Sequence, residues 1–198
     1  MQLLYRLNSN SYFPIHTTGQ WREEAIGIVM CPQCSSVDLS RFPEPIDIVL
    51  NDYPTGIVGG GVFFTGVSIF HTNLIRQMQD VLPQSEFALG RCLDADGRLI
   101  EEFLTCYSRA FIVRRGQVSS RYKVCTGCGA IETIARMPHY IPRFYLSHLH
   151  VYMDRVCRMY LSDTLVRSLD FSQWPDVDLK AVPIQDDVVD GQHLPLDP

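Results

Sequence analysis

Two Cys-x-x-Cys pairs carry the clearest chemical signal in this chain of 198 residues. The first pair is Cys31 and Cys34, and the second, about 90 residues later, is Cys125 and Cys128. Each Cys-x-x-Cys turn aims both sulfur atoms at one point, and four thiolates are a ligand set that tetrahedral Zn²⁺ favours. The spacing therefore predicts one shared zinc site. Because four protein ligands leave no open coordination position, the predicted role of this zinc is structural and not catalytic.

The two pairs differ at the residue that follows the second cysteine. Gly129 follows the second pair, and a glycine there lets backbone amides approach sulfur, whereas the first pair has Ser35 in the same place. Two alternatives stay open: unrelated pairs, one of which could be a redox dithiol, or a site that has lost its metal. The remaining cysteines stand in apolar surroundings, which favours core packing over chemistry. They are Cys92, Cys106 and Cys157.

Three histidines are the main candidates for acid–base or further metal chemistry. His148 and His150 would share one face of a strand, and His139 could join them. No carboxylate motif of a known type accompanies them, so a set of surface or interface histidines is the alternative. The sequence contains no recognisable Ser-His-Asp, Cys-His or helical zinc-protease pattern. We therefore predict no catalytic residue and no enzyme, with an enzyme built around these histidines as a rival interpretation.

Composition narrows the expected partners and compartment. The net charge of -5 argues against a general nucleic-acid binder. The N-terminus lacks the pattern of a signal peptide, and no run of about 18 apolar residues would span a membrane. Seven cysteines, four of them in metal-type spacing, fit a reducing cytoplasm. One local basic stretch keeps a nucleic-acid-binding or regulatory zinc ribbon as the alternative function. The basic stretch contains Arg109, Arg114, Arg115 and Arg121.

The hydrophobic patterns predict the elements that must position these residues. Helices are expected over about 72–81, capped by Thr72 or Asn73, and over 163–169. Asp94 to Gly97 is expected to form a hairpin turn, and the glycines at 59–61 a turn between strands, because no phosphate-loop pattern accompanies them. Strands are expected at about 3–7, 46–50, 62–64, 67–70, 87–93, 103–113, 118–124, 149–160 and 177–183. The fold class is therefore α+β, with two strand–helix–strand units on mixed or antiparallel sheet.

The chain shows weak internal similarity. The segment that starts at Ser68, SIFHTNLIRQM, aligns with the segment that starts at Met159, MYLSDTLVRSL, at an offset of about 90 residues that resembles the offset between the Cys pairs. A degenerate duplication of roughly 26–93 and 118–184 is one interpretation, and coincidence is the other. We expect one domain over 1–184, in which the 31–34 and 125–128 knuckles form a zinc ribbon. An acidic, mobile tail is expected over 185–198.

Several of these features occur together in one known family. Tyr5-Arg-Leu7, Trp21 ahead of the first Cys pair and Cys125-Thr-Gly-Cys-Gly129 follow its layout. So does a closing unit made of Leu161 to Leu169 and Leu179 to Ile184. With these residues the chain resembles the double-CXXCG-motif family of bacterial, especially myxobacterial, proteins. Its closing unit is similar to the C-terminal part of several immunity-protein families of polymorphic toxin systems.

The resemblance implies an immunity protein that binds and neutralises a cognate toxin in the cytoplasm. Recognition would be stoichiometric, and no residue of the toxin-binding surface can be carried over from the family. Aromatic and arginine side chains are common anchors of protein interfaces. The candidates for such anchors, which are equally candidates for the core, are Tyr140, Arg143, Phe144, Tyr145, Tyr152 and Arg155.

Overall fold

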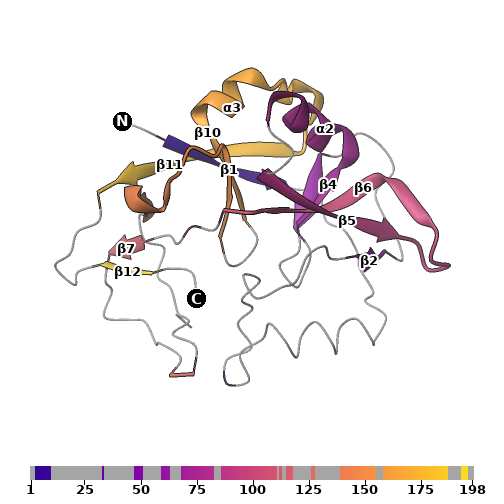
Figure 1. Cartoon of the computed structure of the whole chain (residues 1–198), viewed down its shortest axis with the longest axis horizontal. Coiled ribbons are helices and arrows are strands. Elements are labelled where there is room, and N and C mark those ends of the chain that lie inside the picture. The colour runs from indigo at the N-terminus through magenta and orange to yellow at the C-terminus, as the bar shows by residue number, and fades with distance from the viewer. Residues whose placement is uncertain are drawn as a thin grey trace.

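The structure is a computed structural model, and it describes residues 3–9, 33, 47–50, 59–62, 68–82, 86–110, 112, 115–117, 126–127, 139–154, 158–186 and 193–195. Within these residues the fold is α+β, as the sequence predicts, with two mixed sheets and two α-helices that lie on the same side of them (Figure 1). The described helices are too short or too polar to cross a membrane.

The seven-stranded sheet has the order β12-β7-β8-β11-β1-β10-β9. Its strands are β1 (Leu3–Ser9), β7 (Arg115–Gln117), β8 (His139–Pro142), β9 (Val151–Met153), β10 (Met159–Ser162), β11 (Val177–Gln185) and β12 (His193–Pro195). The five-stranded sheet has the order β2-β5-β6-β4-β3. Its strands are β2 (Ile48–Val49), β3 (Gly60–Val62), β4 (Ser68–His71), β5 (Phe87–Leu93) and β6 (Leu99–Ser108). The helical segments are α2 (Thr72–Val81), α3 (Asp163–Ser168) and the 3₁₀ turns η3 (Arg143–Tyr145) and η4 (Phe171–Gln173).

The five-stranded sheet and five strands of the larger sheet follow one plan. In the former, β2 pairs in parallel with β5, and the pairs β5–β6, β6–β4 and β4–β3 are antiparallel. In the latter, β8 pairs in parallel with β11, and the pairs β11–β1, β1–β10 and β10–β9 are antiparallel. We call β2 to β6 with α2 the first unit, and β8 to β11 with α3 and β1 the second unit.

The registers of the two units also correspond. Gly60 lies opposite Phe70 between β3 and β4, and Val151 lies opposite Leu161 between β9 and β10. Apart from β1, residues of the second unit stand about 90 positions after their counterparts, as the internal similarity of the sequence indicates. The duplication itself stays a prediction, and this correspondence of strand order, direction and register supports it.

One strand departs from the order of the chain. In the first unit β6 follows β5 through a hairpin turn, where Asp94 accepts backbone N–H groups and Gly97 has a φ of 80°. This turn confirms the hairpin expected from the sequence. The counterpart of β6 in the second unit is β1, which pairs with β11 from Leu3 opposite Pro183 to Ser9 opposite Val177. The second sheet is therefore complete only when this early strand lies between β10 and β11.

Both helices begin directly after equivalent strands. The N-cap of α2 is His71, whose imidazole accepts the Asn73 N–H, and the N-cap of α3 is Ser162, whose hydroxyl accepts the Leu165 N–H. The expected caps of α2 are therefore one or two residues too late. The hydroxyl of Thr72 donates instead to the carbonyl of Glu101 on β6.

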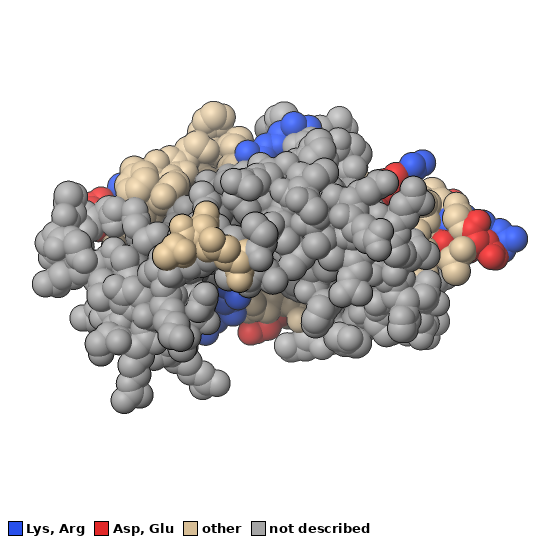
Figure 2. Space-filling model, turned by 90° about the horizontal axis from the view of Figure 1, so that it is seen from below, with Lys and Arg blue, Asp and Glu red and all other residues tan. Residues whose placement is uncertain are grey.

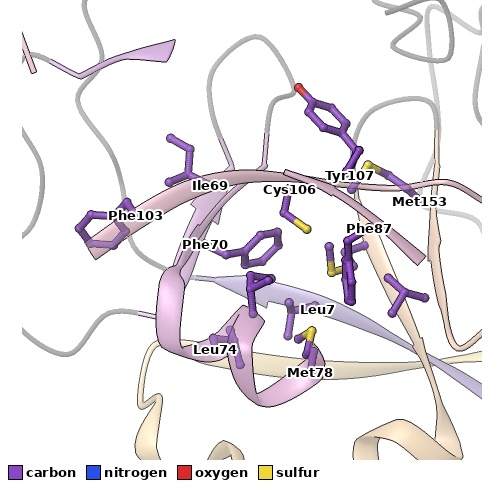
Figure 3. Packing of buried hydrophobic residues seen from close by; sticks show 14 of the residues in the cluster. Leu7, Ile69, Phe70, Leu74, Met78, Phe87, Phe103, Cys106, Tyr107 and Met153 are labelled. Carbon is purple, nitrogen blue, oxygen red and sulfur yellow. The ribbon is translucent and has the colours of Figure 1, made fainter. Parts of the chain in front are cut away.

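The two units share one hydrophobic core. Figure 3 shows Leu74 and Met78 pointing from α2 toward Phe70 of the first unit and Leu7 of the second. Burial of one such aliphatic side chain stabilises a fold by about 1.5–3 kcal/mol, so the units are held together largely by apolar packing. Val81, which the helical pattern also assigns to this face, is half exposed at the end of α2. A second cluster consists of Leu4, Ile112, Ile141, Tyr152, Tyr160, Val182 and Ile184.

The structure describes two short parts of the expected C-terminal tail, residues 185–186 and 193–195. Gln185 still belongs to β11, and the carboxylate of Asp186 forms an ion pair with Arg143. Residues 193–195 form β12, which pairs with β7. Residues 185–186 and 193–195 of the expected tail therefore contact the rest of the fold, and the expected mobility of the tail stays a prediction.

Candidate functional site

The predicted zinc ligands Cys31, Cys34, Cys125 and Cys128 lie outside the described residues, but residues between them are described. Gln33 stands inside the first Cys pair, and Thr126 and Gly127 stand inside the second. The Thr126 hydroxyl donates to the side-chain carbonyl of Gln33 at 3.1 Å. One residue from inside each Cys-x-x-Cys pair therefore contacts the other, although the two are 93 positions apart in the sequence.

Gly127 explains how closely these turns approach. A Cβ atom at position 127 would lie 2.8 Å from both Cδ and Oε1 of Gln33, which is shorter than real Cβ contacts. A larger residue would push the Gln33 side chain away and weaken its contact with Thr126. The neighbouring Gln33 side chain therefore favours glycine at position 127, in addition to any requirement of the local backbone.

The donor set of the two turns fits Zn²⁺. Four thiolates at about 2.3 Å from one ion complete a tetrahedral structural site, and such a site binds no substrate. The described residues, which do not include the four cysteines, contain no group of three or more His, Cys, Asp or Glu side chains placed to hold a metal. The adjacency of Gln33 to Thr126 and Gly127 is thus the structural feature that bears on the predicted site.

A carboxylate of the second unit accepts hydrogen bonds from the backbone of the first unit. Asp176, just before β11, accepts the N–H groups of Gly59 and Gly60 at 2.7 and 3.5 Å. The hydroxyl of Ser9, at the end of β1, lies 2.7 Å from the same carboxylate and also within hydrogen-bond distance of the Gly60 carbonyl. A Cβ at position 59 would lie only 2.4 Å from Val177, which explains the glycine there. We call this arrangement the first clasp.

A second clasp runs in the opposite direction. Glu86, just before β5 of the first unit, accepts the N–H groups of His150 and Val151 at 2.8 and 3.0 Å. The hydroxyl of Ser108, at the end of β6, donates to the Val151 carbonyl at 2.6 Å. Glu86 is only 2% exposed, so these bonds form away from solvent. Each unit therefore supplies a carboxylate and a serine that hold the other unit.

The clasps correspond in position as well as in chemistry. Glu86 and Asp176 precede equivalent strands, and Ser108 and Ser9 end equivalent strands. In both units the residue that caps the helix also donates its N–H across to the clasped segment: His71 to the Gly59 carbonyl at 2.9 Å, and Ser162 to the His150 carbonyl at 2.8 Å. Since both copies bind backbone groups of the same protein, these serines and carboxylates serve the scaffold and not a substrate.

Aromatic side chains pack between the two units beside the first clasp. The His71 ring packs against Trp174 of the second unit at 5.0 Å and against Phe103 at 5.5 Å, measured between ring centroids. Burial lowers the pKa of His71, while the carboxylates of Glu102 and Asp176 oppose that shift. A neutral imidazole suits its role as a cap, because its Nδ1 must accept the Asn73 N–H.

Among the described residues no three or more His, Cys, Asp or Glu side chains form a metal-binding group, so His148 and His150 belong to none there. His139 belongs to β8, and His148 is exposed in the connection between β8 and β9. The Nδ1 of His150 lies 2.8 Å from the Ser162 hydroxyl, which already caps α3. His150 therefore steadies a helix N-terminus, and the structure offers no support for a histidine-based reaction centre among these residues.

Two of the three additional cysteines pack in the core, which confirms that part of the sequence prediction. Cys92 and Cys106 are fully buried in neighbouring strands β5 and β6. Burial raises the pKa of the Cys92 thiol to about 12 and also raises the pKa of Cys106. Both thiols stay protonated at neutral pH and are therefore poor nucleophiles. Cys157 lies outside the described residues.

Charges on the described surface are mixed in sign. On the face shown in Figure 2, acidic and basic residues lie beside one another, most densely at the end that carries the β5–β6 hairpin in Figure 1. Arg109 of the predicted basic stretch is exposed, Arg115 lies in β7, and Arg114 and Arg121 lie outside the described residues. The described residues thus give no specific support to a nucleic-acid-binding face.

The structure separates the candidate interface anchors into core and surface. Tyr140 and Tyr152 are buried, at 5% and 2% exposure, whereas Phe144 is 61% exposed. Arg143 is also exposed, Tyr145 is half-buried, and Arg155 lies outside the described residues. The surface candidates therefore gather in η3.

Sequence reasoning missed the clasps. Their residues are single serines and carboxylates without a local motif, and the strands that bring them together are distant in the chain. The one available signal was the internal offset, which aligns Glu86 with Asp176 in the sequence when the alignment is extended beyond the two helices.

Comparison of the chain with known protein families and with curated proteins finds no match.

Proposed function

We propose that this protein is a cytoplasmic immunity protein that neutralises a cognate bacterial toxin by stoichiometric binding, and that Cys31, Cys34, Cys125 and Cys128 hold a structural Zn²⁺. The hydrogen bond between Thr126 and Gln33 is the observation that supports this proposal, because one of these two residues stands inside each Cys-x-x-Cys pair. The two Cys pairs are among the residues on which the resemblance to the double-CXXCG-motif family rests.

A rigid scaffold suits inhibition by binding. An inhibitor that is already ordered loses little conformational entropy on docking, so more of its contact energy appears as affinity. The two clasps and the shared core join the units at several places. A zinc ion bound by both Cys pairs would add one more link between segments distant in sequence. The chemistry that the zinc supplies is cross-linking of the fold.

The test has two measurements on the purified, tagged full chain. We expect about one zinc per chain by elemental analysis, and we expect a cell lysate of the native organism to yield one stoichiometric protein partner after washing with nuclease and high salt. That partner should arrest growth when it is expressed alone and should lose this effect at a 1:1 ratio with the immunity protein. Retention of nucleic acid in place of a protein would favour the zinc-ribbon regulator instead.

A further inference from the structure

The residues that cap the two helices differ in their response to a proton. His71 caps α2 with its imidazole, whereas Ser162, at the equivalent position of the second unit, caps α3 with its hydroxyl. Each of the two also donates its backbone N–H to the clasped segment of its own unit. Because an imidazole titrates near neutral pH and a hydroxyl does not, only the cap beside the first clasp can change its charge.

The N-terminus of α2 requires a neutral imidazole. The Asn73 N–H donates to Nδ1 of His71 at 3.1 Å, so Nδ1 must carry a lone pair. A proton on Nδ1 turns this acceptor into a donor and places two N–H groups against each other. It also adds a positive charge at the positive end of the helix dipole, and the first turn of α2 contains no acidic residue to offset it. Protonation of His71 therefore removes the cap and destabilises the first turn.

The same ring closes the contact between the two units. It packs on Trp174, whose side chain is almost completely buried. The indole N–H of Trp174 is buried and has no hydrogen-bond acceptor among the described residues. A buried N–H without an acceptor costs the folded state the hydration that this group has lost. Movement of the His71 ring away from Trp174 would return the N–H to water, which lowers the cost of opening this contact.

Two carboxylates face the His71 ring from the elements packed against it. Glu102 belongs to β6 and Asp176 directly precedes β11, and both favour the charged form of the ring. Burial outweighs them, so the pKa of His71 lies below its ordinary value. Since the Glu102 side chain is exposed, we expect a protonated ring to move toward it and toward water, away from Trp174.

The second clasp tolerates a proton on its own histidine. Nδ1 of His150 lies 2.8 Å from the Ser162 hydroxyl, and this hydroxyl accepts the Leu165 N–H that caps α3. A charged His150 can donate to the hydroxyl while the cap stays in place. Glu86 accepts the backbone N–H groups of His150 and Val151, which do not titrate. A proton on His150 therefore leaves the bonds of the second clasp intact.

We propose that the contact of the His71 ring with Asn73 and Trp174 is an acid-sensitive joint: protonation of His71 frees the N-terminus of α2 and uncovers Trp174, while the second clasp keeps the two units attached. The closed contact favours the neutral ring. It is therefore fully formed above the ordinary histidine pKa of 6.5 and loosens as the pH falls below that value. The joint is a property of the isolated chain and depends neither on zinc nor on a toxin.

Hydrogen exchange followed by NMR on the full chain tests the joint, because the N–H groups of each clasp report on that clasp. The protection factors of Asn73 and Gly59, corrected for the intrinsic exchange rate, should fall between pH values of about 7.5 and about 5.5. With one proton linked to opening, the fall should be about threefold to tenfold for each pH unit below 6.5. The protection factors of His150 and Val151 should change less than about twofold.

Two variants supply the controls. His71→Asn keeps an acceptor oxygen at the cap but does not titrate in this range, so its protection factors should be independent of pH. His148→Gln removes an exposed histidine from the β8–β9 connection and should behave like the wild type. Constant protection of Asn73 and Gly59 in the wild type would overturn the proposal. An equal fall at both clasps, which indicates a loss of global stability, would also overturn it, as would the same fall in His71→Asn.

Discussion

Removal of the Glu86 carboxylate tests whether the clasps hold the two units together. Its Oε2 accepts two backbone N–H groups, from His150 at 2.8 Å and Val151 at 3.0 Å, and the residue is 2% exposed. A hydrogen bond to a charged group contributes about 1.5–3 kcal/mol, and buried donors left without an acceptor lose their solvation as well. For two bonds that share one acceptor, we expect Glu86→Ala to lower the free energy of unfolding by about 3–5 kcal/mol.

The assay is thermal and urea unfolding of the full chain. For a chain of this size each kcal/mol shifts the melting temperature by about 2–4 °C, so Glu86→Ala should melt roughly 10 °C below the wild type. The matched control is Glu101→Ala, which removes an exposed carboxylate from the neighbouring strand β6. A surface substitution of this kind should stay within about 0.5 kcal/mol.

Two further variants separate charge from geometry. Glu86→Gln keeps an oxygen acceptor in place and should cost only about 1 kcal/mol. Asp176→Ala, in the half-buried first clasp where the Gly60 N–H lies 3.5 Å away, should cost about 1–3 kcal/mol. A Glu86→Ala protein within 1 kcal/mol of the wild type would refute the reasoning, because it would mean that the His150 and Val151 amides find other acceptors at little cost.

Three other predictions concern the two Cys-x-x-Cys pairs, the helix caps and strand β1, which comes early in the chain but completes the second sheet. Cys125→Ser should lose its zinc and several kcal/mol of stability, whereas Gln33→Ala should keep about one zinc per chain by elemental analysis; a zinc content unchanged by Cys125→Ser would contradict the shared site. Because burial holds the folded-state pKa of His71 below its unfolded value of 6.5, the unfolded chain binds this proton more readily, and stability should fall as the pH drops below about 6.5. His71→Ser, which copies the cap of α3, should reduce that dependence in melts across this range, and an identical pH profile would argue against it. A circular permutant that joins Asp186 to Leu3 through a copy of the turn 94–97, with its new termini between residues 10 and 30, should fold with nearly wild-type circular dichroism; an unfolded product would count against the equivalence of β1 and β6.

The parts of the fold that depend on local pattern could be predicted from the sequence. The spacing of Leu74, Ile75 and Met78 predicts α2 because one helix face must be buried. The Asp-Ala-Asp-Gly sequence predicts the hairpin because glycine accepts the positive φ found at Gly97. The internal offset indicates two similar strand–helix–strand units, and five strands of the larger sheet correspond in order to the five-stranded sheet, with matching register in the β3–β4 and β9–β10 pairs.

The parts that depend on distant segments could not be predicted. Gly59 and Gly60 suggest a turn between strands, yet Gly60 begins β3, and the glycines make room for Val177 and for a strand of the same unit. Glu86 and Asp176 resemble ordinary surface acids in sequence, because their partners are backbone amides that carry no residue signature. The position of β1 inside the second sheet is set by its pairing with β10 and β11, so the local sequence of β1 does not predict it.

The early position of β1 in the chain also sets the order in which parts of the fold can form. The hairpin β5–β6 can form from adjacent residues, whereas β1 must wait for β11, whose last residues are synthesised on the order of tens of seconds later. Contacts this distant in sequence are among the slowest to form. Ser9 ends β1 and meets Asp176, which directly precedes β11. The Ser9 hydroxyl therefore reaches Asp176 only when β1 has paired with β11, so this part of the first clasp forms together with the second sheet.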